Sequence, residues 1–286
     1  MELSVYKGFH ICEKGHSHKV KGLPCQDAAN HLIGNGYAIA AVSDGHGGEK
    51  YFRSAVGSRS AVDVAIRCLQ GFLEGDKESL IGVPEERRDE ILKSLAEQII
   101  ISWQVEIEKN FAEHPLEQQE KDVCAKYDIP IDSFQAHFYG ATLLYTCITP
   151  DYSFTSQIGD GACVYFFSEG DPEIPTCLED SRLGFGVTTS MSDSSPIGNF
   201  HHHFLPVSEG LTKAVFLYTD GVVDSYERMS FLTDFNRRVL DEMNKDEKNA
   251  KNALADWLPK LSEQGSQDDV SIAGVYIYGE SEGQKI

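Results

Sequence analysis

An Asp-Gly-His-Gly-Gly run occupies residues 44–48, at the end of an apolar stretch over 36–44. A carboxylate at the end of a strand is held by a rigid element and can still face a cleft, as a metal ligand must. The glycine after it has no side chain, so its carbonyl oxygen can approach a cation closely. An imidazole can donate or accept a proton near neutral pH. Asp44, Gly45 and His46 are therefore candidates for a side-chain ligand, a backbone ligand and a proton donor.

Three further aspartates lie near the ends of apolar stretches: Asp160, Asp220 and Asp268. A single Asp-Gly pair indicates only a tight turn. The recurrence of aspartate at several strand ends instead predicts that these carboxylates converge on one site. Oxygen ligands without His or Cys at metal-ligand spacing favour Mg²⁺ or Mn²⁺ over zinc.

The chain is strongly acidic. It has 45 acidic and 25 basic residues, which give a formal net charge of −20 at pH 7. Such a charge argues against nucleic acid or an anionic membrane as the main partner. We interpret most of the excess as surface charge that favours solubility, and the remainder as carboxylates whose mutual repulsion divalent cations cancel.

The seven cysteines are scattered, and none belongs to a Cys-x-x-Cys pair. This pattern is typical of reduced thiols rather than of a disulfide framework or a zinc site. The first ten residues lack a basic-then-apolar signal pattern, and no apolar run approaches the roughly 18 residues of a membrane span. We therefore expect a soluble, cytoplasmic protein with no nucleic-acid or membrane partner.

Seven short apolar segments, bounded by glycine or polar turns, are typical of strands. They cover residues 6–12, 36–44, 140–149, 151–160, 161–168, 213–221 and 269–279. Tight turn signals join several of them directly, which favours antiparallel pairing because parallel pairs need long crossovers.

Long stretches with a helical spacing of apolar residues separate some of these strands. They cover residues 51–73, 86–112 and 227–263, the last interrupted near Asn244. This order of strands and helices predicts an α+β layered fold. No linker or repeat divides the chain, so we expect one domain over 1–286. Segment 171–210 is rich in Gly, Ser and Pro and predicts a surface flap.

Six motifs occur in an order that resembles the metal-dependent Ser/Thr protein phosphatases of the PPM, or PP2C, family. They are CQDAA, VSDGHGG, YGATLL, IGDGACVYF, LYTDGVVDS and GSQDDVSI. The resemblance extends from Gly15 to Tyr276, and the segment SHKVKGLPCQDA is most similar to a bacterial branch. Six ordered motifs are far more specific than one. The resemblance implies a four-layer α/β/β/α sandwich, in which pairs of helices flank two antiparallel sheets.

The resemblance also implies a centre of two, or with a weaker site three, Mn²⁺ or Mg²⁺ ions. By motif, Asp44 bridges two ions and Gly45 binds one of them through its carbonyl. Asp220 and Asp268 hold the other ion, and Asp160 matches the third, weaker position.

The reaction that this resemblance implies is hydrolysis of phosphoserine and phosphothreonine by water activated between two ions. His46 would protonate the departing hydroxyl oxygen. Phosphoproteins are then the substrates, and a Ser/Thr kinase is the opposing enzyme. Two alternatives stay open: a pseudophosphatase that binds phosphoproteins or a kinase without turnover, and a phosphohydrolase that acts on small phosphate esters.

One departure from the family pattern concerns the metals. Gln26 stands where many members have a metal-binding Glu. A neutral amide is a weaker ligand, so the following Asp27 is the candidate to hold the second ion, directly or through water.

A second departure concerns the substrate phosphate. Gly22 stands where animal members have a phosphate-binding Arg. His18, Lys19 and Lys21 are the nearby candidates for this role, although none has the two-pronged geometry of arginine.

Three single residues and the histidine run 201–203 have interpretations that need no chemistry at the site. Asp269 takes the place of the family's Asn, which leaves Asp268 as the ligand. We expect Thr142 to pack or to bond locally. Asp224 is expected at a helix start, with support of the metals as the alternative. The adjacent histidines 201–203 point in alternating directions in an extended chain, so we expect them at a flap edge or in solvent rather than around one ion.

Overall fold

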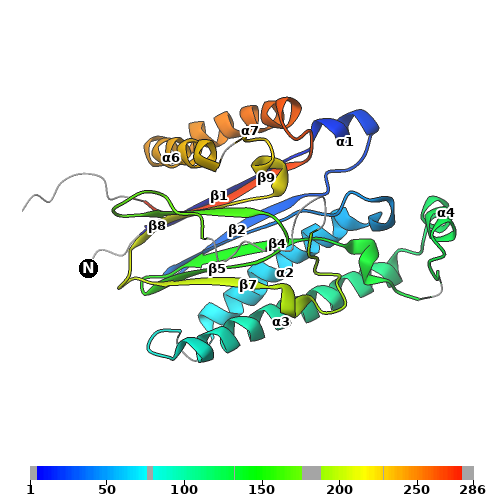
Figure 1. The fold of residues 1–286 in the computed structure, drawn as a ribbon, viewed down its shortest axis with the longest axis horizontal. Helices are drawn as coiled ribbons and strands as arrows, with labels where there is room; N and C mark the ends of the chain where they lie inside the picture. The colour runs from blue at the N-terminus through cyan, green and yellow to red at the C-terminus, as the bar shows by residue number, and fades with distance from the viewer. Residues whose placement is uncertain (1–4, 76–79, 132, 176–187, 228, 279–286) are drawn as a thin grey trace, which may run out of the picture.

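Two antiparallel sheets face each other at the centre of the structure, a computed structural model (Figure 1). It describes residues 5–75, 80–131, 133–175, 188–227 and 229–278. One sheet has the strand order β1(Val5–Glu13), β9(Val270–Tyr278), β8(Thr212–Tyr218), β6(Ala162–Phe167). The other has the order β2(Ala28–Gly34), β3(Tyr37–Ser43), β4(Leu143–Ile148), β5(Tyr152–Ile158), β7(His201–Pro206).

The space between the sheets is filled by an apolar core. Ala38, Ala40 and Val42 of β3 belong to the same buried cluster as Val215 and Leu217 of β8. Both faces of β3 are covered, because every residue of this strand is buried. This is why its sequence is almost continuously apolar instead of alternating.

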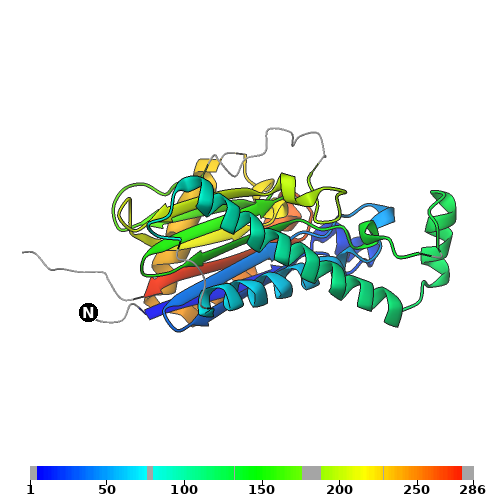
Figure 2. The ribbon, with the colours of Figure 1, turned by 90° about the horizontal axis from the view of Figure 1, so that it is seen from below.

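Helices cover the outer face of each sheet. The long helices α2(Ser54–Glu74) and α3(Glu85–Glu113) pack on the five-stranded sheet, and α6(Met229–Lys245) and α7(Glu247–Gln264) pack on the four-stranded sheet (Figures 1 and 2). The break between α6 and α7 lies where the Asp246 side chain accepts a hydrogen bond from the Asn249 backbone N–H, a typical N-cap. The expected α+β sandwich of four layers is confirmed.

Shorter helical segments connect the strands and the long helices. They are α1(His16–Lys21), α4(Gln118–Lys126), α5(Asp220–Val223) and the single turns η1(Glu49–Tyr51), η2(Ala136–Tyr139) and η4(Pro196–Asn199). Figure 1 shows α1 beside the end of α7, and α4 beyond the end of the sheets. None of the helices in the described ranges is both long and apolar enough to cross a membrane.

Segment 171–210 differs from the flap that its composition predicts. Residues 201–206 form β7, the edge strand that pairs with β5 from Tyr152↔Pro206 to Gln157↔His201. Backbone pairing to β5 therefore outweighs the polar composition of this stretch. Residues 176–187 lie outside the described residues.

Candidate metal centre

Five of the aspartates singled out above lie at the same end of the two sheets. The registers Ala28↔Ser43 and Leu143↔Ile158 bring together the start of β2, the end of β3 and the end of β5. The register Tyr218↔Ile272 does the same for the end of β8 and the start of β9 in the opposing sheet. The residues next to these strand ends are Asp27, Asp44, Asp160, Asp220 and Asp268. Antiparallel pairing thus converts five distant positions into one cluster.

A direct hydrogen bond joins the two sheets inside this cluster. The hydroxyl of Thr219, next to Asp220, donates to Oδ2 of Asp27 at 2.7 Å. Asp27 is buried, and the same threonine oxygen accepts a hydrogen bond from the Ser271 backbone N–H at 3.1 Å. Asp27 and Asp220 therefore lie close together across the boundary between the two sheets, near enough for the charge of Asp220 to act on Asp27.

The carboxylates of the cluster raise one another's pKa. Burial first, and then the negative charge of Asp27, hold the pKa of the Asp44 carboxyl well above its usual range; Asp268 and Asp160 add to the effect. Burial and the charges of Asp44, Asp160 and Asp268 raise the pKa of Asp220 to about 8. So dense a set of acids is unfavourable when all are ionised, which is the condition that a divalent cation relieves.

Several oxygens in the cluster are buried without a hydrogen-bond partner. Among the described residues these include Oδ1 of Asp27, Oδ1 of Asp160 and Oε1 of Gln26. Buried polar atoms are nearly always satisfied in folded proteins, so oxygens left over at one place indicate a missing partner. Carboxylate and amide oxygens are ligands that Mg²⁺ and Mn²⁺ prefer. The residues present therefore fit a centre for these metals.

The loop that carries Asp44 to His46 is fixed through its backbone. The Asp44 N–H donates to the Thr142 hydroxyl at 3.0 Å, and the Thr142 N–H donates to the Asp44 carbonyl at 2.8 Å. The Gly45 N–H donates to the Gln26 carbonyl at 3.1 Å. A Cβ at position 45 would lie 2.6 Å from that carbonyl oxygen, which excludes any larger residue. Thr142 thus forms local hydrogen bonds with Asp44, as expected from the sequence.

His46 follows Asp44 and Gly45 and is half-buried. Its backbone N–H donates to the Gly140 carbonyl at 3.0 Å. Its ring packs edge to face with the Tyr51 ring at a centroid distance of 4.9 Å. Burial lowers the pKa of the imidazole to about 4, and the charge of Asp193 opposes this effect. His46 is therefore neutral at pH 7 before any substrate binds, which differs from the unperturbed value assumed from the sequence.

Asp269 anchors the segment before β2 to the start of β9. Its Oδ1 accepts from the Gly15 N–H at 2.6 Å, and its Oδ2 accepts from the Gln26 N–H at 2.6 Å and bonds Nδ1 of His18 at 2.9 Å. Both side chains of the His18–Asp269 pair are buried. The structure therefore gives His18 a supporting contact with Asp269 rather than a solvent-facing position for binding phosphate. The neighbouring Asp268 is exposed, and its Oδ1 accepts from the Asp269 N–H at 2.8 Å.

The remaining phosphate candidates lie on α1. Lys19 and Lys21 are exposed, and neither has an ion pair with another described residue. Gly22 ends α1 with φ 70°, the left-handed conformation of a helix C-cap, and its N–H bonds back to the carbonyls of His18 and Lys19. An arginine at this position would be strained, which explains the departure from the family pattern in physical terms.

The sequence patterns do not single out two residues beside the site. They are Thr219, which donates a hydrogen bond to Asp27, and Asp193, whose charge acts on the His46 imidazole. Oδ2 of Asp193 is itself fixed by the Ser190 N–H at 3.0 Å and the Asn199 amide at 2.9 Å. Segment 188–200 thus packs against the site, and the Met191 N–H donates to the Ala141 carbonyl at 2.9 Å.

Asp224 and the three histidines are placed as follows. Asp224 is the C-terminal cap of α5 rather than a helix start, and its pKa is raised by burial and by the charge of Asp268. His202 and His203 lie in β7 and point to opposite faces: His202 bonds the Ser156 hydroxyl at 2.8 Å, and the His203 ring meets Tyr165. The expected alternation is confirmed, although these residues form a paired strand rather than a flap edge.

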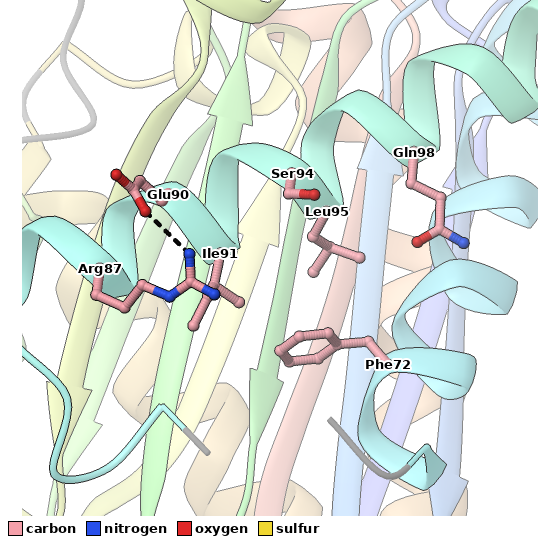
Figure 3. Close-up of a pocket in the computed structure, with 7 residues that line it drawn as sticks. All are labelled: Phe72, Arg87, Glu90, Ile91, Ser94, Leu95 and Gln98. Carbon is pink, nitrogen blue, oxygen red and sulfur yellow. Dashed lines mark hydrogen bonds and ion pairs between the residues drawn. The ribbon is translucent and has the colours of Figure 1, made fainter. Parts of the chain in front are cut away.

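A surface pocket between α2 and α3 is separate from this centre. Figure 3 shows its apolar wall, formed by Phe72, Ile91 and Leu95, and the ion pair of Arg87 with Glu90 at 3.0 Å on its rim. It lies in the outer helical layer on the five-stranded sheet, and none of the candidate site residues lines it.

Comparisons with known proteins identify the family and the fold of the chain. The sequence profile of the family described as protein phosphatase 2C matches residues 14–259. No curated protein sequence matches the chain. Among solved structures, the serine/threonine phosphatase Stp1 from Staphylococcus aureus is similar, with 13% identity, coverage of 98% of each chain and a TM-score of 0.57.

Two more solved structures have similar folds. The S. agalactiae serine/threonine phosphatase is 14% identical, covers 96% of this chain and 100% of its own, and has a TM-score of 0.56. RsbX in complex with magnesium is 11% identical, covers 95% of both chains and has a TM-score of 0.51. At these identities the likeness concerns the fold.

Proposed function

Because the chain belongs to the protein phosphatase 2C family, we propose that it is a metal-dependent phosphatase that hydrolyses phosphoserine and phosphothreonine in proteins. One observation carries the proposal beyond family membership. Asp27 is buried and Asp44 and Asp220 are half-buried, and the pKa values of all three carboxyls are raised by burial and by neighbouring carboxylates. A protein keeps such a cluster when bound cations offset the repulsion.

The proposed ligands are the residues that the family motifs imply, together with Asp27. Asp44, the Gly45 carbonyl, Asp220 and Asp268 would hold two ions, with Asp27 and Asp160 as further ligands for these or a third. Bound there, Mn²⁺ or Mg²⁺ would acidify a water molecule and stabilise the negative charge of the phosphoryl group in the transition state of its transfer.

The protein's own groups have separate tasks in this proposal. Thr219 and Asp269 fix the positions of Asp27 and of the Gln26 backbone through the hydrogen bonds described above. His46 would donate its ring proton to the departing serine or threonine oxygen. The charge of a bound phosphate would add to that of Asp193 in raising the pKa of the imidazole. We further propose that the substrates are phosphoproteins made by an opposing Ser/Thr kinase in the cytoplasm.

A phosphate-release assay tests the proposal. Purified protein is incubated with a phosphothreonine peptide and with p-nitrophenyl phosphate, each with Mn²⁺ and with EDTA. We expect turnover of the peptide with Mn²⁺ and none with EDTA. Peptide binding without turnover would identify a pseudophosphatase instead, and turnover of the small ester alone would identify a small-ester phosphohydrolase.

Two matched variants check the ligand assignment. Asp220→Asn should lose most of the activity, because a neutral amide replaces a carboxylate in the cluster. Asp256→Asn, at an exposed position on α7, removes the same charge and should retain full activity. Equal activity of the two variants would refute the assignment of Asp220.

A further inference from the structure

Two cysteines that are distant in the sequence bring their thiols into contact beside the metal centre. Sγ of Cys12, in β1, lies 3.5 Å from Sγ of Cys25, in the irregular segment between α1 and β2. Both residues are partly exposed, whereas Cys124, Cys147 and Cys163 are buried in the core. Contact with a second thiol and access to solvent thus coincide at this pair.

We propose that Cys12 and Cys25 are a redox modification site: they form a reversible disulfide that acts on the adjacent metal centre. The spacing of the cysteines in the sequence does not indicate this pair, because α1 lies between its two members. The existence of the disulfide does not depend on the proposed phosphatase activity, whereas its effect on metal binding rests on that proposal.

The surroundings of the two sulfurs make closure of the bond feasible. The sulfurs must approach from 3.5 Å to about 2.05 Å. Cys12 is held by pairing with Ser271 of β9, but Cys25 belongs to no helix or strand. The necessary movement therefore falls on Cys25 and its neighbours. Closure would link β1 to the segment after α1, between two cysteines that are 13 positions apart in the sequence.

The reaction requires an oxidant of a common chemical class, a small disulfide. One cysteine sulfur attacks a sulfur of that reagent, forms a mixed disulfide and releases one small thiol. The second cysteine sulfur then attacks the cysteine sulfur of the mixed disulfide, which forms the Cys12–Cys25 bond and releases the other small thiol. The two cysteines lose two electrons and two protons, and the reagent gains both as two thiols.

The pair is coupled to the metal centre through the Asp27 backbone. Sγ of Cys12 and Sγ of Cys25 lie 3.4 and 3.9 Å from the Asp27 carbonyl oxygen, to which both thiols donate. A disulfide removes both donors. It also pulls on Gln26, whose backbone N–H bonds Asp269 and whose carbonyl accepts from Gly45. Oxidation should therefore displace the segment that positions Asp27 and weaken metal binding.

The first experiment tests the disulfide alone, in metal-free full-length protein. The protein is equilibrated with oxidised glutathione, alkylated and analysed by peptide mapping and intact mass. We expect a mass lower by two hydrogen atoms, one cross-linked pair of peptides that contains Cys12 and Cys25, and full reversal by dithiothreitol. Alkylation of both cysteines, or stable glutathione adducts on each, would overturn the proposal.

The second experiment tests the coupling by Mn²⁺ binding, measured by calorimetry on reduced and oxidised protein. We expect affinity to fall at least about fivefold on oxidation. Cys25→Ser should abolish this difference, and Cys124→Ser, a thiol on α4 away from the pair, should preserve it. Should Cys25→Ser fail to fold, Cys12→Ser gives the same comparison from the other partner.

The two proposals fail in different ways. A disulfide that forms while Mn²⁺ affinity stays equal in both redox states would overturn the coupling. Absence of Mn²⁺ binding in both states would refute the metal centre and the coupling with it, but would leave the mapped disulfide standing.

Discussion

The Thr219 hydroxyl donates a 2.7 Å hydrogen bond to the Asp27 carboxylate, across the boundary between the two sheets. Thr219 follows β8 in the four-stranded sheet, and Asp27 precedes β2 in the five-stranded sheet. Because Asp27 is buried, its carboxylate has lost its contact with water. In the absence of a cation, the Thr219 hydroxyl is the main described side-chain group that offsets this loss. One hydroxyl therefore stabilises both the packing of the sheets and the arrangement of the acidic cluster.

Replacing this threonine should destabilise the protein. Thr219→Val keeps the shape but leaves the Asp27 carboxyl and the Ser271 N–H without their partner. We expect a loss of roughly 1–3 kcal/mol in the free energy of unfolding, measured by urea denaturation in EDTA. Thr219→Ser, which keeps the hydroxyl, should lose less. Equal losses for the two variants would show that the methyl group matters and the hydrogen bond does not.

Without metal, stability should fall as the pH rises. The folded state raises the pKa of Asp220 from 3.8 to about 8, and those of Asp44 and Asp27 are raised as well. Between these limits the folded protein binds more protons than the unfolded chain, so the free energy of unfolding decreases from about pH 4 to pH 8. Thermal melts in EDTA across this range should show the decrease, and saturating Mn²⁺ should remove it. A melting temperature in EDTA that rises from pH 4 to pH 8 would contradict this account.

Asp220→Asn should separate stability from activity. In EDTA at pH 7 the variant no longer carries a carboxyl whose ionisation the cluster opposes, so its melting temperature should rise by roughly 2–8 °C. Mn²⁺ should stabilise the variant less than it stabilises the wild type. Asp256→Asn should change neither quantity. A lower melting temperature for metal-free Asp220→Asn would mean that this carboxyl has a structural partner.

The parts of the fold that sequence could predict are those with a strong local pattern. The paired helices α2 and α3 and the buried strand β3 have long apolar periodicities, and their observed ends lie close to the expected ones. Strand β7 has no such pattern, because His-His-His is a polar start, and its place is decided by pairing with β5. Helix α1 has six residues, too few for a periodic apolar face, and its end is fixed by the φ of Gly22.

The site, like the fold, has features that local sequence predicts and features that depend on long-range contacts. The position of Asp44, Asp160, Asp220 and Asp268 at strand ends follows from local sequence, because each lies beside an apolar strand. The contact of Thr219 with Asp27 joins residues 192 positions apart, and no local pattern encodes it.

Gln26→Glu should strengthen metal binding and weaken the metal-free protein. The Gln26 amide nitrogen donates to the His46 carbonyl at 3.2 Å, and its Oε1 is buried without a hydrogen-bond partner. A glutamate would place a negative charge against that carbonyl and beside the other acids. We expect a lower melting temperature in EDTA and a several-fold higher affinity for Mn²⁺ by calorimetry. Unchanged affinity would show that position 26 does not reach the ions.

Substitution of His46 should affect poor leaving groups most. A serine or threonine alkoxide needs a proton as it departs, whereas nitrophenolate leaves readily without one. His46→Gln keeps a hydrogen-bond donor of similar size but cannot transfer a proton. We expect turnover of a phosphothreonine peptide to fall by about 10²–10⁴-fold and that of p-nitrophenyl phosphate to fall much less. Mn²⁺ affinity is the control and should be unchanged, because His46 contributes no ligand in the proposed centre. Equal losses on both substrates would mean that the His46 ring positions the Asp44 loop, through its contact with Tyr51, and donates no proton.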